Sequence, residues 1–305
     1  MAEITLNIDI VSCESMAESV VYIDGKFLPE SEAKISVFDH GFLYGDGVFE
    51  GIRAYNGVVF KLGEHVDRLY DSARFLNIEI PMSKEELIHA ILETVRRNGL
   101  KSCYIRVIVT RGVGDLGLDP RRCRKPTVII IAKPMARLLG EKPISLIISS
   151  VRRDGIDATN HQAKSLNYLN SVLAKMEAIN AGADDAVMLD NRGFVSEATA
   201  ENIFIVKGGK IITPPPSSGI LMGITRECVI EIAKRLGYEV VEREITPFEV
   251  MTADEVFLTG TAAEIVPVER VNGRRIGLRV PGPITERLMR EFDGLKNDPG
   301  QGVKI

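Results

Sequence analysis

One lysine in the second half of the chain stands where it could react with a carbonyl compound. Lys164 lies in the segment H-Q-A-K-S-L-N-Y-L-N-S, directly before a run of apolar residues with helical spacing. A lysine amine in a half-buried position can form a Schiff base with such a compound. A lone lysine before a helix is more often a solvated surface charge, so Lys164 by itself decides nothing.

Three later segments could assist such a lysine. Glu197, within S-E-A-T-A-E-N, could hold a proton on a ring nitrogen, or it could face solvent in a turn. In G-I-T-R the backbone of Ile224 and Thr225 opens a helix and could bind a phosphate, although an ordinary helix cap has the same composition. The segment L-T-G-T-A-A-E, with Thr261, offers hydroxyls and small residues that let a ligand approach, as a plain loop also would.

The order of these segments carries more information than any one of them. A pyridoxal phosphate (PLP) enzyme needs a lysine, a phosphate site and a charged partner for the pyridine nitrogen. K-S-L-N-Y, S-E-A-T-A-E-N, G-I-T-R and G-T-A-A-E, in this order, resemble the fold-type IV PLP enzymes. That group contains the branched-chain aminotransferases, the D-amino-acid aminotransferases and the aminodeoxychorismate lyases. The resemblance runs from about residue 21 to about residue 271.

The resemblance implies a role for each cofactor residue. Lys164 would carry PLP as a Schiff base and later move a proton, Glu197 would pair with the pyridine nitrogen, and Tyr168 with the phenolic oxygen. The phosphate would be held by Arg68, Ile224, Thr225 and Thr261. Without the resemblance, Arg68 would be a helix-surface partner of Glu64 and Asp71.

Substrate residues follow from the first half of the chain, where Y-G-D-G-V-F-E-G-I-R and Y-I-R resemble the branched-chain enzymes. Tyr44 and Phe49 would form an apolar wall, and Arg106 would contact the side chain of glutamate. Tyr104 would hold the α-carboxylate together with the backbone of Thr261 and Ala262.

The segment G-V-G-D-L-G-L-D-P, residues 112–120, resembles the family's interdomain loop. Leu118 in this loop would reach the pocket of a second subunit, so a homodimer or higher homo-oligomer is expected. Two features depart from many bacterial branched-chain enzymes: the short spacing of K-S-L-N-Y, and Leu138 where a tyrosine is often found.

The implied activity is a ping-pong transamination between L-leucine, L-isoleucine or L-valine and 2-oxoglutarate. It would give branched-chain 2-oxo acids and L-glutamate. A D-amino-acid aminotransferase and an aminodeoxychorismate lyase of the same fold are the alternatives.

The elements that must position these residues fall into two groups. Residues 20–60 alternate β-branched and aromatic side chains with D-G and N-G turns, which predicts strands joined by hairpins. Two amphipathic helices follow, the second after a Ser83 cap, and strands are predicted at 103–110 and 127–132. We expect residues 17–134 to form a small α+β domain, after a flexible extension at 1–16.

Two prolines and Gly140 interrupt the pattern, so a linker is expected at residues 135–143. A larger domain, residues 144–296, follows, with a helix that carries Val172, Leu173, Met176 and Ile179 on one face and ends at Gly182. Strands are predicted near 185–189, 202–206, 238–242 and 254–258, and helices from Gly223 and near 284–292. Residues 297–305 are expected to be a frayed tail. The resemblance implies a mixed, β-barrel-like sheet with helices in this domain, within a two-domain α+β or α/β fold.

Composition excludes several other classes of protein. The formal charge of -4, with acids and bases mixed, gives no basic stripe for nucleic acid. The four cysteines lie far apart, which favours reduced thiols, and the four histidines show no metal-binding spacing, so no metal is expected. No leader-like start and no apolar run of about 18 residues occurs. We therefore expect a soluble, cytoplasmic protein with no membrane contact.

Overall fold

A computed structural model describes residues 18–305, so the expected extension at 1–16 lies outside the described residues. Its α-helices are α1 (His40–Tyr44), α2 (Leu62–Phe75), α3 (Lys84–Arg97), α4 (Leu169–Asn180), α5 (Ile224–Arg235), α6 (Pro247–Met251) and α7 (Pro283–Lys296). Short 3-10 turns are η1 (Glu30–Glu32), η2 (Pro120–Arg122), η3 (Pro216–Ser218) and η4 (Pro299–Gln301). Within the described part, no helix is long and apolar enough to cross a membrane.

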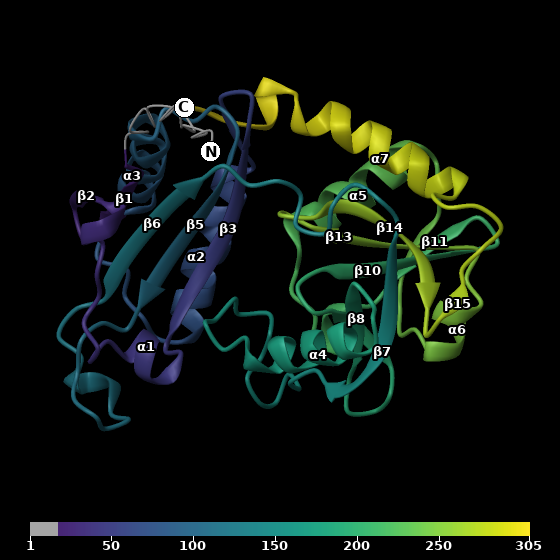
Figure 1. Cartoon of the computed structure of the whole chain (residues 1–305), viewed down its shortest axis with the longest axis horizontal. Coiled ribbons are helices and arrows are strands. Elements are labelled where there is room, and N and C mark those ends of the chain that lie inside the picture. Colours follow the sequence, from purple (N-terminus) through teal and green to yellow (C-terminus); the bar gives the residue numbers. More distant parts are fainter. Residues whose placement is uncertain (1–17) are drawn as a thin grey trace, which may run out of the picture.

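The strands form two sheets. The first contains β1 (Val20–Ile23), β2 (Lys26–Pro29), β3 (Gly47–Tyr55), β4 (Val58–Phe60), β5 (Cys103–Thr110), β6 (Thr127–Lys133) and β16 (Gly302–Lys304). The second contains β7 (Ile144–Arg152), β8 (Asp185–Leu189), β9 (Val195–Ala198), β10 (Asn202–Lys207), β11 (Lys210–Thr213), β12 (Val240–Glu242), β13 (Glu255–Gly260), β14 (Glu264–Val271) and β15 (Arg274–Arg275). Figure 1 shows the two sheets side by side, each with its own helices.

The first sheet is antiparallel, in the order β16-β4-β3-β5-β6-β1-β2. Its strands alternate, as the sequence predicts: Val48, Ile52, Ile105 and Val107 are fully buried in the core under α2 and α3. Ser83 caps α3 with a reciprocal capping box to Glu86, which confirms the predicted start of that helix. The opposite face of β3 and β5 is left for the second sheet.

The second sheet is mixed, in the order β12-β11-β10-β13-β14-β7-β8-β9 with β15 beside β14. β7 pairs in parallel with both β14 and β8, and β11 pairs in parallel with β12, while the other ladders are antiparallel. Helices α5 and α7 cover one part of this sheet and α4 lies against β7 and β8. The curled, mixed sheet agrees with the fold class that the resemblance implies.

The end of the chain differs from our expectation. Residues 302–304 are not frayed: β16 pairs with β4, and Val303 lies opposite Val59. Ile305 packs on the core of the first sheet, and its backbone N–H donates to Gly57 O at 2.9 Å. Helix α7 runs along the second sheet and returns the chain to the first one (Figure 1). A three-residue strand is too short to show a period in the sequence, and its partner lies more than 240 residues away in the chain, which is why it was missed.

Helix α4 buries small residues rather than its large ones. Its buried side chains are Ser171, Ala174 and Ala178, which face β7 and β8. The predicted apolar face, by contrast, is exposed in the single chain, with Met176 53% and Ile179 62% accessible. A stripe of large apolar side chains left open to water marks a contact surface.

Candidate active site

The residues predicted to do chemistry meet in one cavity between the two sheets. The cavity has a volume of about 310 Å³. Its lining combines β3 and β5 with the segment before α4, the first turn of α5 and the end of β13. The lining residues are Phe49, Gly51, Arg68, Tyr104, Arg106, Leu138, Lys164, Leu166, Tyr168, Ala200, Glu201, Asn202, Leu221, Gly223, Ile224, Thr225, Thr259, Gly260, Thr261 and Ala262.

Strands β3 and β5 supply one wall through simple alternation. Because Gly51 lies opposite Arg106 in the ladder, Phe49, Tyr104 and Arg106 share the face turned away from the helices. The Arg106 guanidinium lies 4.5 Å from the centre of the Phe49 ring and donates to the Tyr104 hydroxyl at 3.0 Å. Gly51 makes this possible, since a Cβ there would lie 2.2 Å from the Tyr104 hydroxyl oxygen. The wall is therefore apolar with one cation.

Lys164 is fixed by the backbone of both halves of the chain. Its N–H donates to Ser72 Oγ of α2 at 3.0 Å, and its carbonyl accepts from Phe49 N at 3.0 Å. Leu166 N donates to Gly47 O at 2.9 Å, so this segment extends the sheet beside the start of β3. The amine reaches into the cavity, where Nζ lies 3.1 Å from the Tyr168 hydroxyl and 4.6 Å from the centre of the Phe49 ring.

Tyr168 is held between two rings. It is the N-cap residue of α4, and its ring meets Phe49 edge-on at 5.1 Å and His161 edge-on at 5.4 Å between ring centres. Burial and the charge of Arg153 lower the pKa of His161 to about 3. The imidazole next to Tyr168 is therefore neutral at physiological pH.

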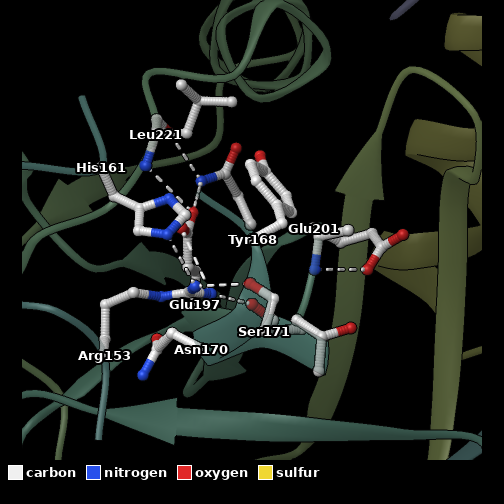
Figure 2. A network of polar contacts seen from close by, with 12 residues as sticks. Arg153, His161, Tyr168, Asn170, Ser171, Glu197, Glu201 and Leu221 are labelled. Atoms are coloured by element: carbon white, nitrogen blue, oxygen red, sulfur yellow. Dashed lines mark hydrogen bonds and ion pairs between the residues drawn. The ribbon is translucent and has the colours of Figure 1, made fainter. Parts of the chain in front are cut away.

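Glu197 lies directly behind the cavity wall, in the network of Figure 2. Its Oε2 accepts from Asn202 Nδ2 at 3.0 Å and from Leu221 N at 3.1 Å, and its Oε1 lies 3.5 Å from Arg153 Nη2. Burial raises the pKa of Glu197, and Arg153 and the Leu221 N–H oppose that rise. Arg153 is itself fully buried and donates to Ser171 Oγ at 2.8 Å.

Arg68 points into the cavity rather than along the helix surface. Buried Glu50 holds it in two hydrogen bonds, Nε to Oε1 at 2.7 Å and Nη2 to Oε2 at 2.9 Å. A third bond runs from Arg68 Nη1 to Met222 O at 2.7 Å, beside the start of α5. The surface ion pair with Glu64 and Asp71 is therefore not formed. His65 also bonds Glu50, at 2.8 Å, and Arg68 and His65 hold the pKa of Glu50 well below its usual range despite burial.

The first turn of α5 has donors to spare. Its N-cap residue is Gly223, which provides no side-chain acceptor, so the N–H groups of Ile224 and Thr225 face the cavity end of the helix. A Cβ on Gly223 would lie 2.1 Å from Asn202 Oδ1, so only glycine fits there. Across the cavity, Thr259 Oγ1 is buried and has no hydrogen-bond partner within residues 18–305. An anion placed here would meet the positive end of a helix.

Two predicted residues lie outside this cavity. Tyr44 does not line it: its hydroxyl donates to Leu116 O at 2.6 Å and so holds the 112–120 loop. Leu118 is 79% exposed on that loop and contacts no pocket of its own chain. Both sit on α1 and the loop beside it, at the edge of the first sheet. Glu197 also lies behind the lining rather than in it.

Sequence reasoning missed three residues that hold the site. Glu50 lies within Y-G-D-G-V-F-E-G-I-R, where its burial on an otherwise apolar strand was the available signal. Asn202 follows Glu197 by five residues and bonds it. For Arg153 the sequence R-R gave no sign of which arginine turns inward. Within the described ranges, no group of three or more His, Cys, Asp or Glu side chains is placed to hold a metal ion.

Comparison with known proteins assigns this site to a family. The family model described as "Amino-transferase class IV" matches residues 47–271, which include the whole cavity. The chain belongs to the class IV aminotransferases. A relative from Methanocaldococcus jannaschii, named as a putative branched-chain-amino-acid aminotransferase, is 59% identical to it over 285 residues, which cover 93% of this chain and 98% of that protein.

Solved structures of class IV aminotransferases superpose closely on this chain. The branched-chain amino acid aminotransferase of Escherichia coli has a TM-score of 0.89 at 39% identity, covering 91% of this chain and 94% of that one. The corresponding enzyme of the source abbreviated T.th., complexed with N-(5'-phosphopyridoxyl)-L-glutamate, has a TM-score of 0.88 at 44% identity, covering 93% and 95%.

Proposed function

We propose that this chain is a PLP-dependent aminotransferase that exchanges amino groups between branched-chain L-amino acids and 2-oxoglutarate. One observation carries the proposal: the Lys164 amine, the donor-rich end of α5 and the single cation of an apolar wall, Arg106, open into the same cavity. Relatives that share the fold are named for this activity, and one of them holds a phosphopyridoxyl-glutamate.

The residues present fit the cofactor. The uncapped end of α5 suits a phosphate, and the buried Thr259 hydroxyl still lacks a partner among the described residues. Ile224, Thr225 and Thr261 would hold the phosphate together with Arg68, whose orientation Glu50 fixes. Glu197, kept close to Arg153, would pair with the pyridine nitrogen, and Tyr168 with the phenolic oxygen. Lys164 would hold the cofactor covalently.

When bound, the cofactor supplies the electron sink that lets a proton leave the Cα of an amino acid. Lys164 Nζ, released by the incoming substrate, would take that proton and return it one position along the conjugated system. Tyr168, fixed by His161 and Phe49, would keep the ring in place, and the neutral His161 adds no charge that competes with Glu197.

Substrate choice would come from the wall of β3 and β5. Phe49, with Leu138 across the cavity, offers apolar contact for an aliphatic side chain, and Arg106 offers a cation for the second carboxylate of 2-oxoglutarate or glutamate. Tyr104 and the backbone of Thr261 and Ala262 would bind the α-carboxylate. One cavity can thus accept an aliphatic and a dicarboxylic substrate in turn.

A second copy of the chain would complete the site. Leu118 and Tyr44 lie outside the cavity of their own chain, on a loop free to reach a neighbour, and α4 presents the exposed apolar stripe of Val172, Leu173 and Met176. A homodimer would cover both surfaces.

The activity is tested with purified protein loaded with PLP. L-Leucine, L-isoleucine and L-valine should each yield glutamate from 2-oxoglutarate, whereas D-alanine should give little. Turnover of D-alanine at a rate comparable to that of L-leucine, or release of pyruvate from aminodeoxychorismate, would overturn the proposed substrate class.

A further inference from the structure

Glu201 lines the cavity but has none of the roles considered above. Its side chain is 3% exposed, and its stem packs under Gly260, where a Cβ would lie 3.1 Å from Glu201 Cγ. It therefore stands next to Thr261 and Ala262, the turn proposed to bind the substrate α-carboxylate. A negative charge at this place would oppose that binding.

The partner of Glu201 is a second buried acid, Asp185 of β8. The two carboxyl groups are in hydrogen-bond contact, although Asp185 is completely buried. One Asp185 oxygen, Oδ1, accepts from Thr199 Oγ1 at 2.7 Å and from Ala186 N at 2.9 Å, and lies 3.4 Å from Lys175 Nζ. The other, Oδ2, has no donor among the residues that the structure describes.

Two carboxylates in contact cannot both stay ionised in a dry environment, because their repulsion is not screened. The orphan oxygen of Asp185 needs a donor, and a protonated Glu201 is the nearest group that can be one. Glu201 Oε2 accepts from Ala200 N at 3.2 Å, which leaves the other oxygen to carry a proton (Figure 2). The contacts are thus satisfied by one proton and not by none.

We propose that Glu201 and Asp185 hold one proton between them, and that this proton keeps the cavity wall uncharged so that substrates with carboxylates can bind. With the proton in place, Asp185 is balanced by Lys175 and the pair adds no net charge to the wall. Without it, one negative charge faces the substrate. This specificity role rests on the proposed function.

The surroundings favour the protonated state. The charged or titratable groups nearest to Glu201 are Asp185 on β8, Lys175 on α4 and Tyr168 at the start of α4, while the turn at 259–263 contributes none. Across the cavity stand Lys164, Arg68, Tyr104 and Arg106. Burial, followed by the charge and hydrogen bond of Asp185, raises the pKa of Glu201 to about 8. The proton is therefore held at neutral pH and lost in mild alkali.

The first test measures the proton directly, without turnover. Infrared spectra of the PLP-loaded protein should show a protonated-carboxyl C=O band at about pH 7 that disappears as the pH rises through the pKa of Glu201. In Glu201→Gln this band should be missing. Persistence of the band in Glu201→Gln, or its absence from the unmodified protein, would overturn the proposal even if the enzyme is fully active.

The second test compares KM values for a pair of 2-oxo acids, which carry no amine of their own. From about pH 7 to about pH 9 we expect KM to rise roughly tenfold for 2-oxoglutarate and roughly threefold for 4-methyl-2-oxopentanoate, because one new charge repels two carboxylates more than one. In Glu201→Gln this difference between the two acids should vanish. The exposed Glu239→Gln serves as matched control and should keep it.

Equal pH dependence in Glu201→Gln and the unmodified protein would contradict the role of the pair in substrate binding. Absence of turnover with both acids would instead contradict the proposed transamination, so the two failures can be told apart.

Discussion

Arg153 is among the largest side chains of this chain that are fully buried, and it has Glu197 at 3.5 Å. Its other contacts are Ser171 Oγ at 2.8 Å, the Ala198 carbonyl and His161 Nε2 at 3.2 Å. A buried cation and a buried acid are tolerable only together, since each alone would lie uncompensated in a medium of low polarity. At the residue scale, Arg153 thus sets the position and charge of Glu197.

Replacing Arg153 by methionine should therefore lower the free energy of unfolding by roughly 3–5 kcal/mol, because Glu197 is left buried without its partner. Urea denaturation checks this value. The neighbouring Arg152 is exposed, and Arg152→Met should change the free energy by less than about 0.5 kcal/mol. Equal effects of the two substitutions would show that Arg153 is not coupled to Glu197.

Glu50 acts in the same way on Arg68. Glu50→Gln keeps the shape but removes the charge that orients the guanidinium, so PLP should bind roughly 10–100-fold more weakly, as expected for the loss of one or two charge-assisted hydrogen bonds. Titration of the apoprotein with PLP measures this. Glu64→Gln, on the exposed side of α2, is the control and should leave cofactor affinity unchanged. Unchanged affinity in Glu50→Gln would contradict the role of Glu50.

At the scale of elements, regular period gave the best predictions. Alternation located β5 at Cys103–Thr110, and the Ser83 signal located the start of α3. The four chemical segments were also brought together as their order predicted. Partners far apart in sequence escaped, because no local pattern encodes them: Glu50 with Arg68, Arg153 with Glu197, and β16 with β4.

Strand β16 completes the edge of the first sheet, and η4 before it accepts from Lys61 N through Gln301 O at 2.9 Å. Deleting residues 298–305 should remove these bonds and uncover Phe60 and Val59, and we expect the Tm to fall by about 4–8 °C, at roughly 2–4 °C per kcal/mol. Calorimetry of the truncated protein gives the answer. An unchanged Tm would support the frayed tail that was expected from the sequence.

At the scale of the whole molecule, the most informative feature is the apolar stripe on α4. Large side chains point outward because the inward face needs Ser171, Ala174 and Ala178 to fit against β7 and β8. The amphipathic pattern was read correctly, but a single sequence does not tell whether such a face meets its own core or another chain.

If the stripe is the contact between two copies, the double substitution Leu173→Glu and Met176→Glu should convert a dimer into a monomer, because two carboxylates per chain would be forced into an apolar interface. Light scattering after size exclusion measures the mass. Leu278→Glu alters a side chain that is 99% exposed elsewhere and should leave the mass unchanged. A monomeric unmodified protein, or a double variant of unchanged mass, would contradict the interface.

Every role proposed for the cavity depends on which side chain holds the cofactor. The most direct test is to reduce PLP-loaded protein with borohydride, digest it and locate the phosphopyridoxyl group by mass spectrometry. We predict that the group lies on Lys164, and that L-leucine added before the reduction, without any 2-oxo acid, prevents the labelling. Labelling of another lysine, or labelling that L-leucine does not affect, would contradict the assignment of Lys164 as the residue that binds PLP and yields it to the substrate.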